Sequence, residues 1–135
     1  MVRRGMFLVL TAALAGCGGE RFELPQRTPE VAAEKVRVVA LLEQRGGAAS
    51  DGRKTTCAVR ILKIEGAATY AWSSCTSVDA NGVSGGASAP IRIDGDEVRA
   101  PADGGGYADS VREMFPERLA EAVLMYQDRL QPRSE

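Results

Sequence analysis

The side chains that could carry chemistry are mainly acidic, because this chain of 135 residues contains no histidine. Ser-His-Asp and Cys-His nucleophiles, histidine general bases and histidine metal sites are therefore excluded. A carboxylate-pair hydrolase stays open, since two acids need only meet in space. The candidate acids fall in expected turns, where carboxylates stay solvated and ionised: Glu65, Asp94, Asp96, Glu97 and Asp103. We expect no catalytic residue, no metal site, no cofactor and no enzymatic activity.

Three cysteines are the other reactive groups, and the first stands apart from the other two. Cys17 follows Leu14-Ala15-Gly16, at the end of an apolar stretch that begins at Gly5 behind Arg3 and Arg4. A membrane-spanning helix needs roughly 20 apolar residues, so this run is too short to cross a bilayer. A short apolar run led by arginines and ending in small residues is typical of a secretory signal.

Leu14-Ala15-Gly16-Cys17 resembles the lipobox of bacterial lipoproteins at all four positions. The resemblance implies transfer of diacylglycerol to the Cys17 sulfur, cleavage after Gly16 and often acylation, for example with palmitate, of the new amino group. The mature chain would then be lipid-anchored on the extracytoplasmic face of the cell membrane or outer membrane. Gly18, in place of Asp, weakly favours the outer membrane. The resemblance covers only the leader and implies nothing about the rest of the chain.

With Cys17 assigned to lipid attachment, two cysteines remain, Cys57 and Cys75. An exported protein folds in an oxidising compartment, where two such cysteines can pair. They lie in two strand-like segments, 55–64 and 68–78, on either side of a turn at Gly66. A hairpin centred on Gly66 brings together residues whose numbers sum to 132, as 57 and 75 do. Directly opposed residues lie within disulfide reach. We predict a Cys57–Cys75 disulfide rather than two free thiols or a redox pair.

The same register places Arg60 beside Trp72 and Leu62 beside Tyr70. Tryptophan, tyrosine and arginine contribute much of the binding energy at protein interfaces, so Arg60, Tyr70 and Trp72 form a candidate binding surface. The alternative is that Trp72 and its strand neighbours belong to the core.

Further elements must hold this hairpin in place. Thr28-Pro29 predicts the start of a helix that ends at Arg45-Gly46-Gly47, before a loop at 46–54. A glycine-rich connection at 79–88 leads to short strands at 90–93 and 97–100, joined by an Asp94-Gly95 turn. A turn at 110–115 precedes a helix from 116 to about 130. One face of this last segment is apolar: Val111, Phe115, Leu119, Ala122, Val123, Tyr126 and Leu130.

These elements predict a single α+β domain with an N-terminal helix, a three- to four-stranded antiparallel sheet, a C-terminal helix and one disulfide. Both helices are expected on one face of the sheet. The predicted divisions are a signal peptide at 1–16, a lipidated tether at 17–27, the domain at 28–130 and a frayed tail at 131–135.

The charge balance sets the expected partners. Lys and Arg number 17 against 18 Asp and Glu, which indicates no nucleic-acid partner. We expect a small membrane-anchored lipoprotein that acts as a non-catalytic binding or interaction module of the cell envelope. Its expected partners are the membrane, through Cys17, and an envelope protein or ligand. The alternatives are a small-ligand-binding or enzyme-inhibitor lipoprotein and, less favoured, a carboxylate-dependent hydrolase.

Overall fold

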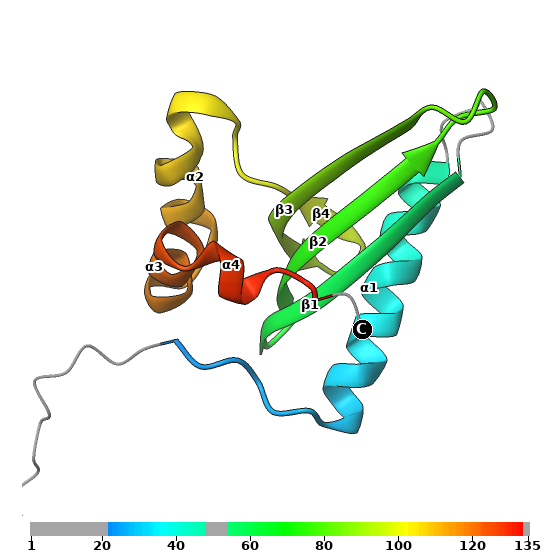
Figure 1. Ribbon diagram of the computed structural model, residues 1–135. Coiled ribbons are helices and arrows are strands. Elements are labelled where there is room, and N and C mark those ends of the chain that lie inside the picture. Colours follow the sequence, from blue (N-terminus) through cyan, green and yellow to red (C-terminus); the bar gives the residue numbers. More distant parts are fainter. Residues whose placement is uncertain (1–21, 48–53, 134–135) are drawn as a thin grey trace, which may run out of the picture.

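The fold is a four-stranded antiparallel sheet with helices on both of its faces (Figure 1). The computed structural model describes residues 22–47 and 54–133; the predicted leader, Cys17 and most of the expected loop at 46–54 lie outside them. The strands follow chain order in the sheet, as β1 (Lys54–Glu65), β2 (Ala68–Val78), β3 (Ser84–Asp94) and β4 (Glu97–Arg99). The helices are α1 (Pro29–Gly47), the short 3-10 helix η1 (Gly104–Gly106), α2 (Tyr107–Met114), α3 (Glu117–Met125) and α4 (Gln127–Leu130). The predicted α+β class with one Cys57–Cys75 disulfide is confirmed.

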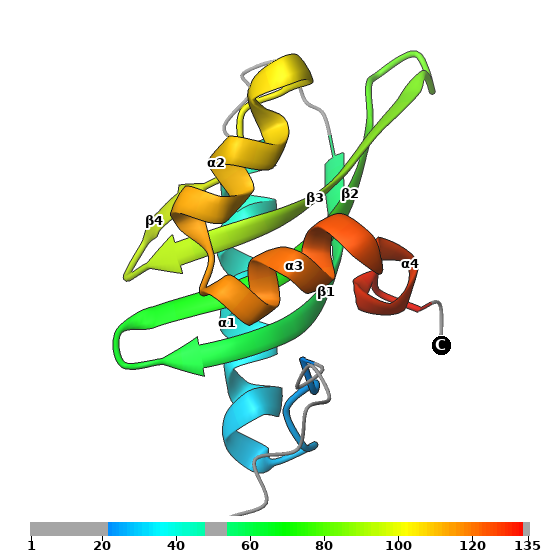
Figure 2. The same ribbon diagram turned by 90° about the vertical axis from the view of Figure 1, so that its left-hand side faces the viewer.

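Both faces of the sheet are apolar, and each has its own helical cover. One set of strand residues packs with the fully buried Val38 of α1: Val59, Ile61, Ala71, Ile91 and Ile93. The opposite set belongs to one cluster with residues of α2, α3 and α4, the helices that cover the other face of the sheet in Figures 1 and 2: Leu62, Ala68, Tyr70 and Trp72. The expectation that both terminal helices share one face is therefore wrong. Strands that are apolar on both sides need cover on both sides.

Helix α1 begins where the sequence predicts. Thr28 Oγ1 accepts a hydrogen bond of 3.2 Å from the Val31 backbone N–H, and Pro29 holds the first helical position. Two acids on the helix then reach the sheet. Glu34 accepts a hydrogen bond from Thr69 of β2, and Glu43 accepts one from the Cys57 N–H of β1. These contacts fix α1 against the β1–β2 hairpin.

The β1–β2 hairpin combines a two-residue turn with a bulge. Cys57 faces Cys75 and Arg60 faces Trp72, as the predicted register requires. Beyond Ile61 the register shifts, so that Lys63, rather than Leu62, faces Tyr70. The cause is the turn: Glu65 pairs with Ala68 across Gly66-Ala67, and Gly66 has the positive φ of 58° that suits the first position of a tight hairpin turn. Leu62 is the extra residue that reconciles this turn with the cysteine pairing.

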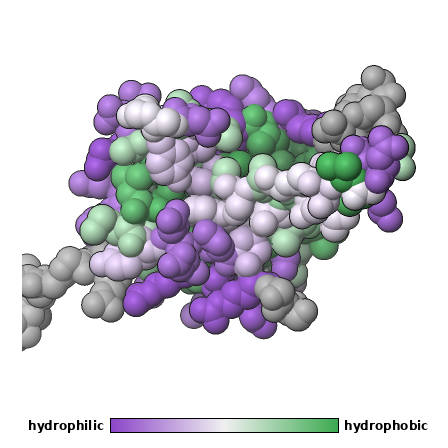
Figure 3. All heavy atoms as spheres, turned by 45° about the horizontal axis from the view of Figure 1, so that its top comes forward, coloured by the Kyte–Doolittle hydropathy of each residue, from purple (hydrophilic) through white to green (hydrophobic). Residues whose placement is uncertain are grey.

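The β2–β3 hairpin is longer than the sequence predicts. Val78 pairs with Ser84, so the expected connection at 79–88 contains a five-residue loop and then the first half of β3. The Asp79 carboxylate accepts hydrogen bonds from the N–H groups of Asn81 and Val83, both at 2.9 Å. Figure 3 shows a pale band of near-neutral hydropathy that runs to this projecting end, where both hydrophobic and hydrophilic atoms lie at the surface. The predicted Asp94-Gly95 turn is present between β3 and β4, with Gly95 at a φ of 63°.

The C-terminal apolar segment forms three helices instead of a turn and one helix. Pro116 separates α2 from α3, and Tyr126, with a φ of −134°, separates α3 from α4. Most of the predicted apolar face is buried, but Tyr126 is 50% exposed because the chain turns at this residue. The predicted fraying at 131–135 is also wrong for residues 131–133. Gln131 and Pro132 are half-buried, and the Gln131 carbonyl accepts a hydrogen bond from Arg60 of β1.

Candidate functional site

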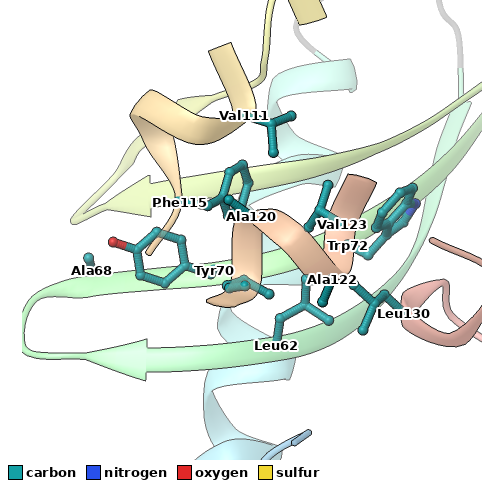
Figure 4. Packing of buried hydrophobic residues seen from close by; sticks show 11 residues of the cluster. Leu62, Ala68, Tyr70, Trp72, Val111, Phe115, Ala120, Ala122, Val123 and Leu130 are labelled. Carbon is teal, nitrogen blue, oxygen red and sulfur yellow. The ribbon is translucent and has the colours of Figure 1, made fainter. Parts of the chain in front are cut away.

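Tyr70 and Trp72 belong to the core, which corrects their interpretation as a contact surface. Trp72 is 2% exposed and Tyr70 is 5% exposed. The Trp72 ring lies near Val123 and Leu130 under the C-terminal helices, and the Tyr70 ring lies 5.5 Å from that of Phe115 (Figure 4). Trp72 Nε1 donates a hydrogen bond of 2.8 Å to Ser88 Oγ, so its polar group is satisfied inside the fold. Helices α2, α3 and α4 cover both rings.

Arg60 has a different environment from its two predicted companions. Its Nη1 donates hydrogen bonds to the carbonyl oxygens of Arg129, at 2.8 Å, and Gln131, at 3.4 Å. These carbonyls lie at the C-terminal end of α4, where a cation complements the helix dipole. Burial, and then the nearby cations Arg133 and Arg27, lower the pKa of Arg60. Arg60 therefore joins β1 to the C-terminal segment at a place where positive charges gather.

A groove of about 610 Å³ lies along β1, and we call it the β1-edge groove. Its walls are the segment at 25–28, helix α1, strand β1 and the chain that follows α4. Apolar side chains form much of its lining: Val31, Val39, Val59, Ile61 and Pro132. Four cations also line it: Arg27, Lys35, Arg60 and Arg133. No acidic residue is among the residues that line it in the described part of the chain.

Three of these cations have no acidic partner in the described structure. Among residues 22–47 and 54–133, no carboxylate forms an ion pair with Arg27, Lys35 or Arg133. Glu43, the acid of α1 that reaches β1, instead accepts the Cys57 N–H at 3.1 Å. The β1-edge groove is thus positively charged although the whole chain carries a net charge of −1.

The floor of the groove is the outer edge of β1, where Val59 and Ile61 are buried. β1 is a terminal strand of the sheet, with β2 as its neighbour on one side. The Cα atoms of Cys57 and Cys75 lie 4.1 Å apart, as in a non-hydrogen-bonded antiparallel pair, whose N–H and C=O groups point away from the partner strand. The bond from the Cys57 N–H to Glu43 agrees with this direction. Because the direction of the backbone groups alternates from one strand residue to the next, Val59 and Ile61 also direct their N–H and C=O groups away from β2.

Most of the candidate catalytic acids lie at one end of the sheet: Asp94, Asp96 and Glu97 belong to the β3–β4 turn, and Glu65 lies at the same end because Ala68 is the cross-strand partner of both Glu65 and Asp94. Asp94 binds Arg92 at 3.0 Å and Arg99 at 3.3 Å, and chiefly the hydrogen bond from Arg92 lowers the pKa of Asp94. Glu65 pairs with Lys63 at 3.4 Å on another hairpin. Asp96, Glu97 and Asp103 are exposed. Within the described ranges, no three histidine, cysteine or acidic side chains lie close enough together to hold a metal ion.

The described chain ahead of α1, residues 22–28, is part of the folded body. Phe22 and Leu24 are partly buried and pack against the core cluster beneath α2–α4. These two residues of the predicted tether therefore contribute apolar side chains to the core. Cys17, the predicted lipidation site, lies outside the described residues. Among the helices of the described part, none combines the length and apolar character needed to cross a bilayer.

The comparisons with known proteins identify no relative. No family model matches the chain, and the searches of curated proteins and of solved structures found no match. The candidate site therefore depends on the geometry described above.

The sequence analysis named Arg60 but missed the other cations of the groove. Lys35 could have been noticed, because it lies between Val31 and Val39 at four-residue spacing on one row of α1. Arg27 and Arg133 fell in segments interpreted as tether and frayed tail. Their approach to Arg60 depends on tertiary contacts that local sequence patterns do not report.

Proposed function

We propose that this protein is a lipid-anchored, extracytoplasmic lipoprotein that acts as a non-catalytic binding module of the cell envelope. The arginine-led apolar leader and the resemblance of Leu14-Ala15-Gly16-Cys17 to a lipobox support anchoring through Cys17, in the cell membrane or outer membrane. The Cys57–Cys75 disulfide supports an oxidising compartment. A diacylglycerol group with a further acyl chain provides stable membrane attachment without an apolar protein surface.

The β1-edge groove is the observation that carries the binding role. It combines apolar walls with cations that lack acidic partners in the described structure, and it runs along β1, a terminal strand of the sheet. The candidate acids give less support to a hydrolase, because Asp94 and Glu65 form ion pairs with Arg92 and Lys63 and the other acids are exposed, whereas a carboxylate-pair hydrolase needs two acids that flank one bond. A binding role requires only a surface that complements a partner in shape and charge.

The anchoring part can be tested with Cys17→Ser. We expect the wild-type protein to stay in the membrane fraction after an alkaline wash and the variant to leave it, because the sulfur that carries the lipid is gone. Thr11→Ser, which changes the leader outside the lipobox, serves as the matched control and should stay membrane-bound. Retention of the Cys17→Ser protein in washed membranes would contradict the anchor.

The binding part can be tested in the same cells with a photo-crosslinking amino acid at Ala58, an exposed residue that lines the groove. We expect a discrete crosslinked product from this position and its loss when Cys17→Ser removes the protein from the membrane. The control position is Arg112 on α2, which is exposed and outside the groove. The same products from both positions, or none from Ala58, would count against a binding role of the groove.

A further inference from the structure

We infer that the β1-edge groove docks onto anionic phospholipid headgroups of the membrane that carries the Cys17 anchor. This inference rests on the proposed function, because it names the partner of the binding module and requires the chain to be held at a membrane. A headgroup of this kind presents a negatively charged phosphate next to the apolar carbons of the lipid. The phosphate would lie among the cations of the groove, and the carbons would contact its aliphatic lining.

The first argument is the charge of the groove. Four cations line it, and no acidic residue of the described chain lines it with them: Arg27, Lys35, Arg60 and Arg133. After burial, the charges of Arg133 and Arg27 lower the pKa of Arg60, so these cations are close enough to repel one another. An anion placed among them relieves this repulsion. Anionic lipids attract basic side chains that lie near the membrane surface.

The second argument is which atoms of the groove a partner can reach. Val59 and Ile61 on the floor are only 2% and 4% exposed, and Glu43 already accepts a hydrogen bond at this edge of β1. The floor therefore gives no access to a protein strand. The exposed lining residues are side chains around the floor: Arg27, Thr28, Ala32, Lys35, Ala58 and Arg133. A headgroup needs only side-chain contacts, and a groove of about 610 Å³ has the volume of a small-ligand site.

The third argument is the distance of the groove from the anchor. Pro25 lines the groove and also lines the cavity that Phe22 lines. Pro25 is the eighth residue after Cys17, so the two positions are at most roughly 28 Å apart. Figures 1 and 2 show the described N-terminal segment at the end of the molecule opposite the loop between β2 and β3. The groove therefore borders the segment that joins the domain to its proposed anchor, and the headgroups are within its reach.

Two other occupants fit the groove less well. In a two-fold dimer formed through the groove, the same patch meets itself, so that Lys35 and Arg133 approach cations of the second copy. Like charges at an interface oppose association. An acidic segment of another protein would have to displace headgroups that the anchor holds beside the groove at a high effective concentration. Anionic lipid is therefore the better complement.

The test uses the lipid-anchored protein in phosphatidylcholine nanodiscs that contain an increasing fraction of phosphatidylglycerol. We expect the amide NMR signals of Lys35 and Ala58 to shift in a saturable way as this fraction rises, because anionic headgroups enter the groove. The signal of Gly82, in the loop between β2 and β3, should not shift. Phosphatidylethanolamine, which has no net charge, should leave all three signals unchanged. Added salt should reduce the shifts.

Protein variants locate the docking site, with the Ala58 signal as the readout. Lys35→Glu and Arg133→Glu should each raise the phosphatidylglycerol fraction that gives half of the shift by about fivefold or more. Lys35→Arg keeps the positive charge and should behave like the wild type. Arg112→Glu reverses an exposed cation on α2, outside the groove, and should stay within about twofold of the wild type. Fluorescence of the buried Trp72 confirms that each variant is folded.

Several results would overturn the inference. They are signals that do not respond to phosphatidylglycerol, equal effects of Lys35→Glu and Arg112→Glu, and the same shifts from inorganic phosphate at an equal concentration of phosphate groups. The last result would make the groove a site for soluble phosphate compounds. Crosslinking at Ala58 keeps the two proposals separable. A lipid adduct agrees with headgroup docking, whereas a protein adduct without a response to phosphatidylglycerol leaves the binding module in place and makes the lipid partner wrong.

Discussion

Glu34 illustrates at the scale of one residue how α1 is fixed to the sheet. Its Oε1 lies 2.5 Å from Arg37 Nη2 and accepts a hydrogen bond of 2.8 Å from Thr69 Oγ1. Thr69 is a buried polar residue of β2, so Glu34 satisfies a hydroxyl that would otherwise lack a partner under the helix. The hydrogen bond from Arg37 is the main cause that lowers the pKa of Glu34, and the bond from Thr69 acts in the same direction.

Glu34→Gln should lower the free energy of unfolding by about 1 kcal/mol at pH 7, because a charged hydrogen-bond acceptor becomes neutral. The pKa of Glu34 is lower in the folded state than its ordinary value of 4.5, so the ionised side chain contributes stability above pH 4.5. That contribution is lost as the pH falls through the folded-state pKa. Urea unfolding at a series of pH values should show the difference between the two proteins shrinking below pH 4.5.

The matched control for this measurement is Glu121→Gln, which changes an exposed acid on α3. It should change stability by less than about 0.5 kcal/mol at any pH in the series. A pH-independent loss in Glu34→Gln would show that the carboxylate charge contributes nothing and that the packing of this side chain accounts for the effect.

At the scale of the element, the β1–β2 hairpin must satisfy two different registers. The cysteine pairing requires opposed numbers that sum to 132, whereas the two-residue turn at Gly66-Ala67 requires 133. One extra residue in β1 resolves the difference, and the bulge supplies it at Leu62. Leu62 is buried under α3, so the residue that repairs the register also contributes to the core.

Replacing both Cys57 and Cys75 with serine should lower the free energy of unfolding by about 3 kcal/mol, because the disulfide closes a segment with a separation of 18 residues and restricts the unfolded chain. Urea unfolding under oxidising conditions measures this loss. Adding a reductant should destabilise the wild type by a similar amount and leave the double variant unchanged. Equal midpoints for the oxidised wild type and the double variant would contradict this role.

Local chemistry made several elements predictable. Thr28-Pro29 specifies a helix start, the numbers of Cys57 and Cys75 specify a pairing, and Gly95 specifies a turn. The assignment of helices to faces was not predictable in the same way. Periodicity identifies buried residues such as Ile61 and Leu62, but it does not say which helix covers each. The groove could not be predicted from local patterns, because its four cations come from four separate segments: Arg27, Lys35, Arg60 and Arg133.

At the scale of the whole molecule, the N-terminal segment gives the domain an orientation relative to its proposed anchor. Phe22 lines a cavity of about 580 Å³ together with Lys63, Ile64 and Pro116, near the β1–β2 turn. Only four residues lie between Cys17 and Phe22, so the two positions are at most roughly 18 Å apart. The loop at 79–83 lies at the other end of β2, whose 11 residues extend about 35 Å. The turn at Gly66 should therefore lie nearer the bilayer than Gly82.

Phe22→Ser should allow the domain to reorient relative to its anchor. The substitution removes an apolar side chain that packs against the core, and it thereby lengthens the free tether. In lipid nanodiscs with spin-labelled headgroups, the wild-type amide signal of Gly66 should broaden several times more than that of Gly82. In the variant the two should broaden more equally, while fluorescence of the buried Trp72 confirms that the domain is folded. Glu23→Ser, at the exposed neighbouring position, should retain the wild-type contrast. Equal broadening of Gly66 and Gly82 in the wild type would mean that the domain turns freely on its anchor, and that docking of Phe22 does not set its direction.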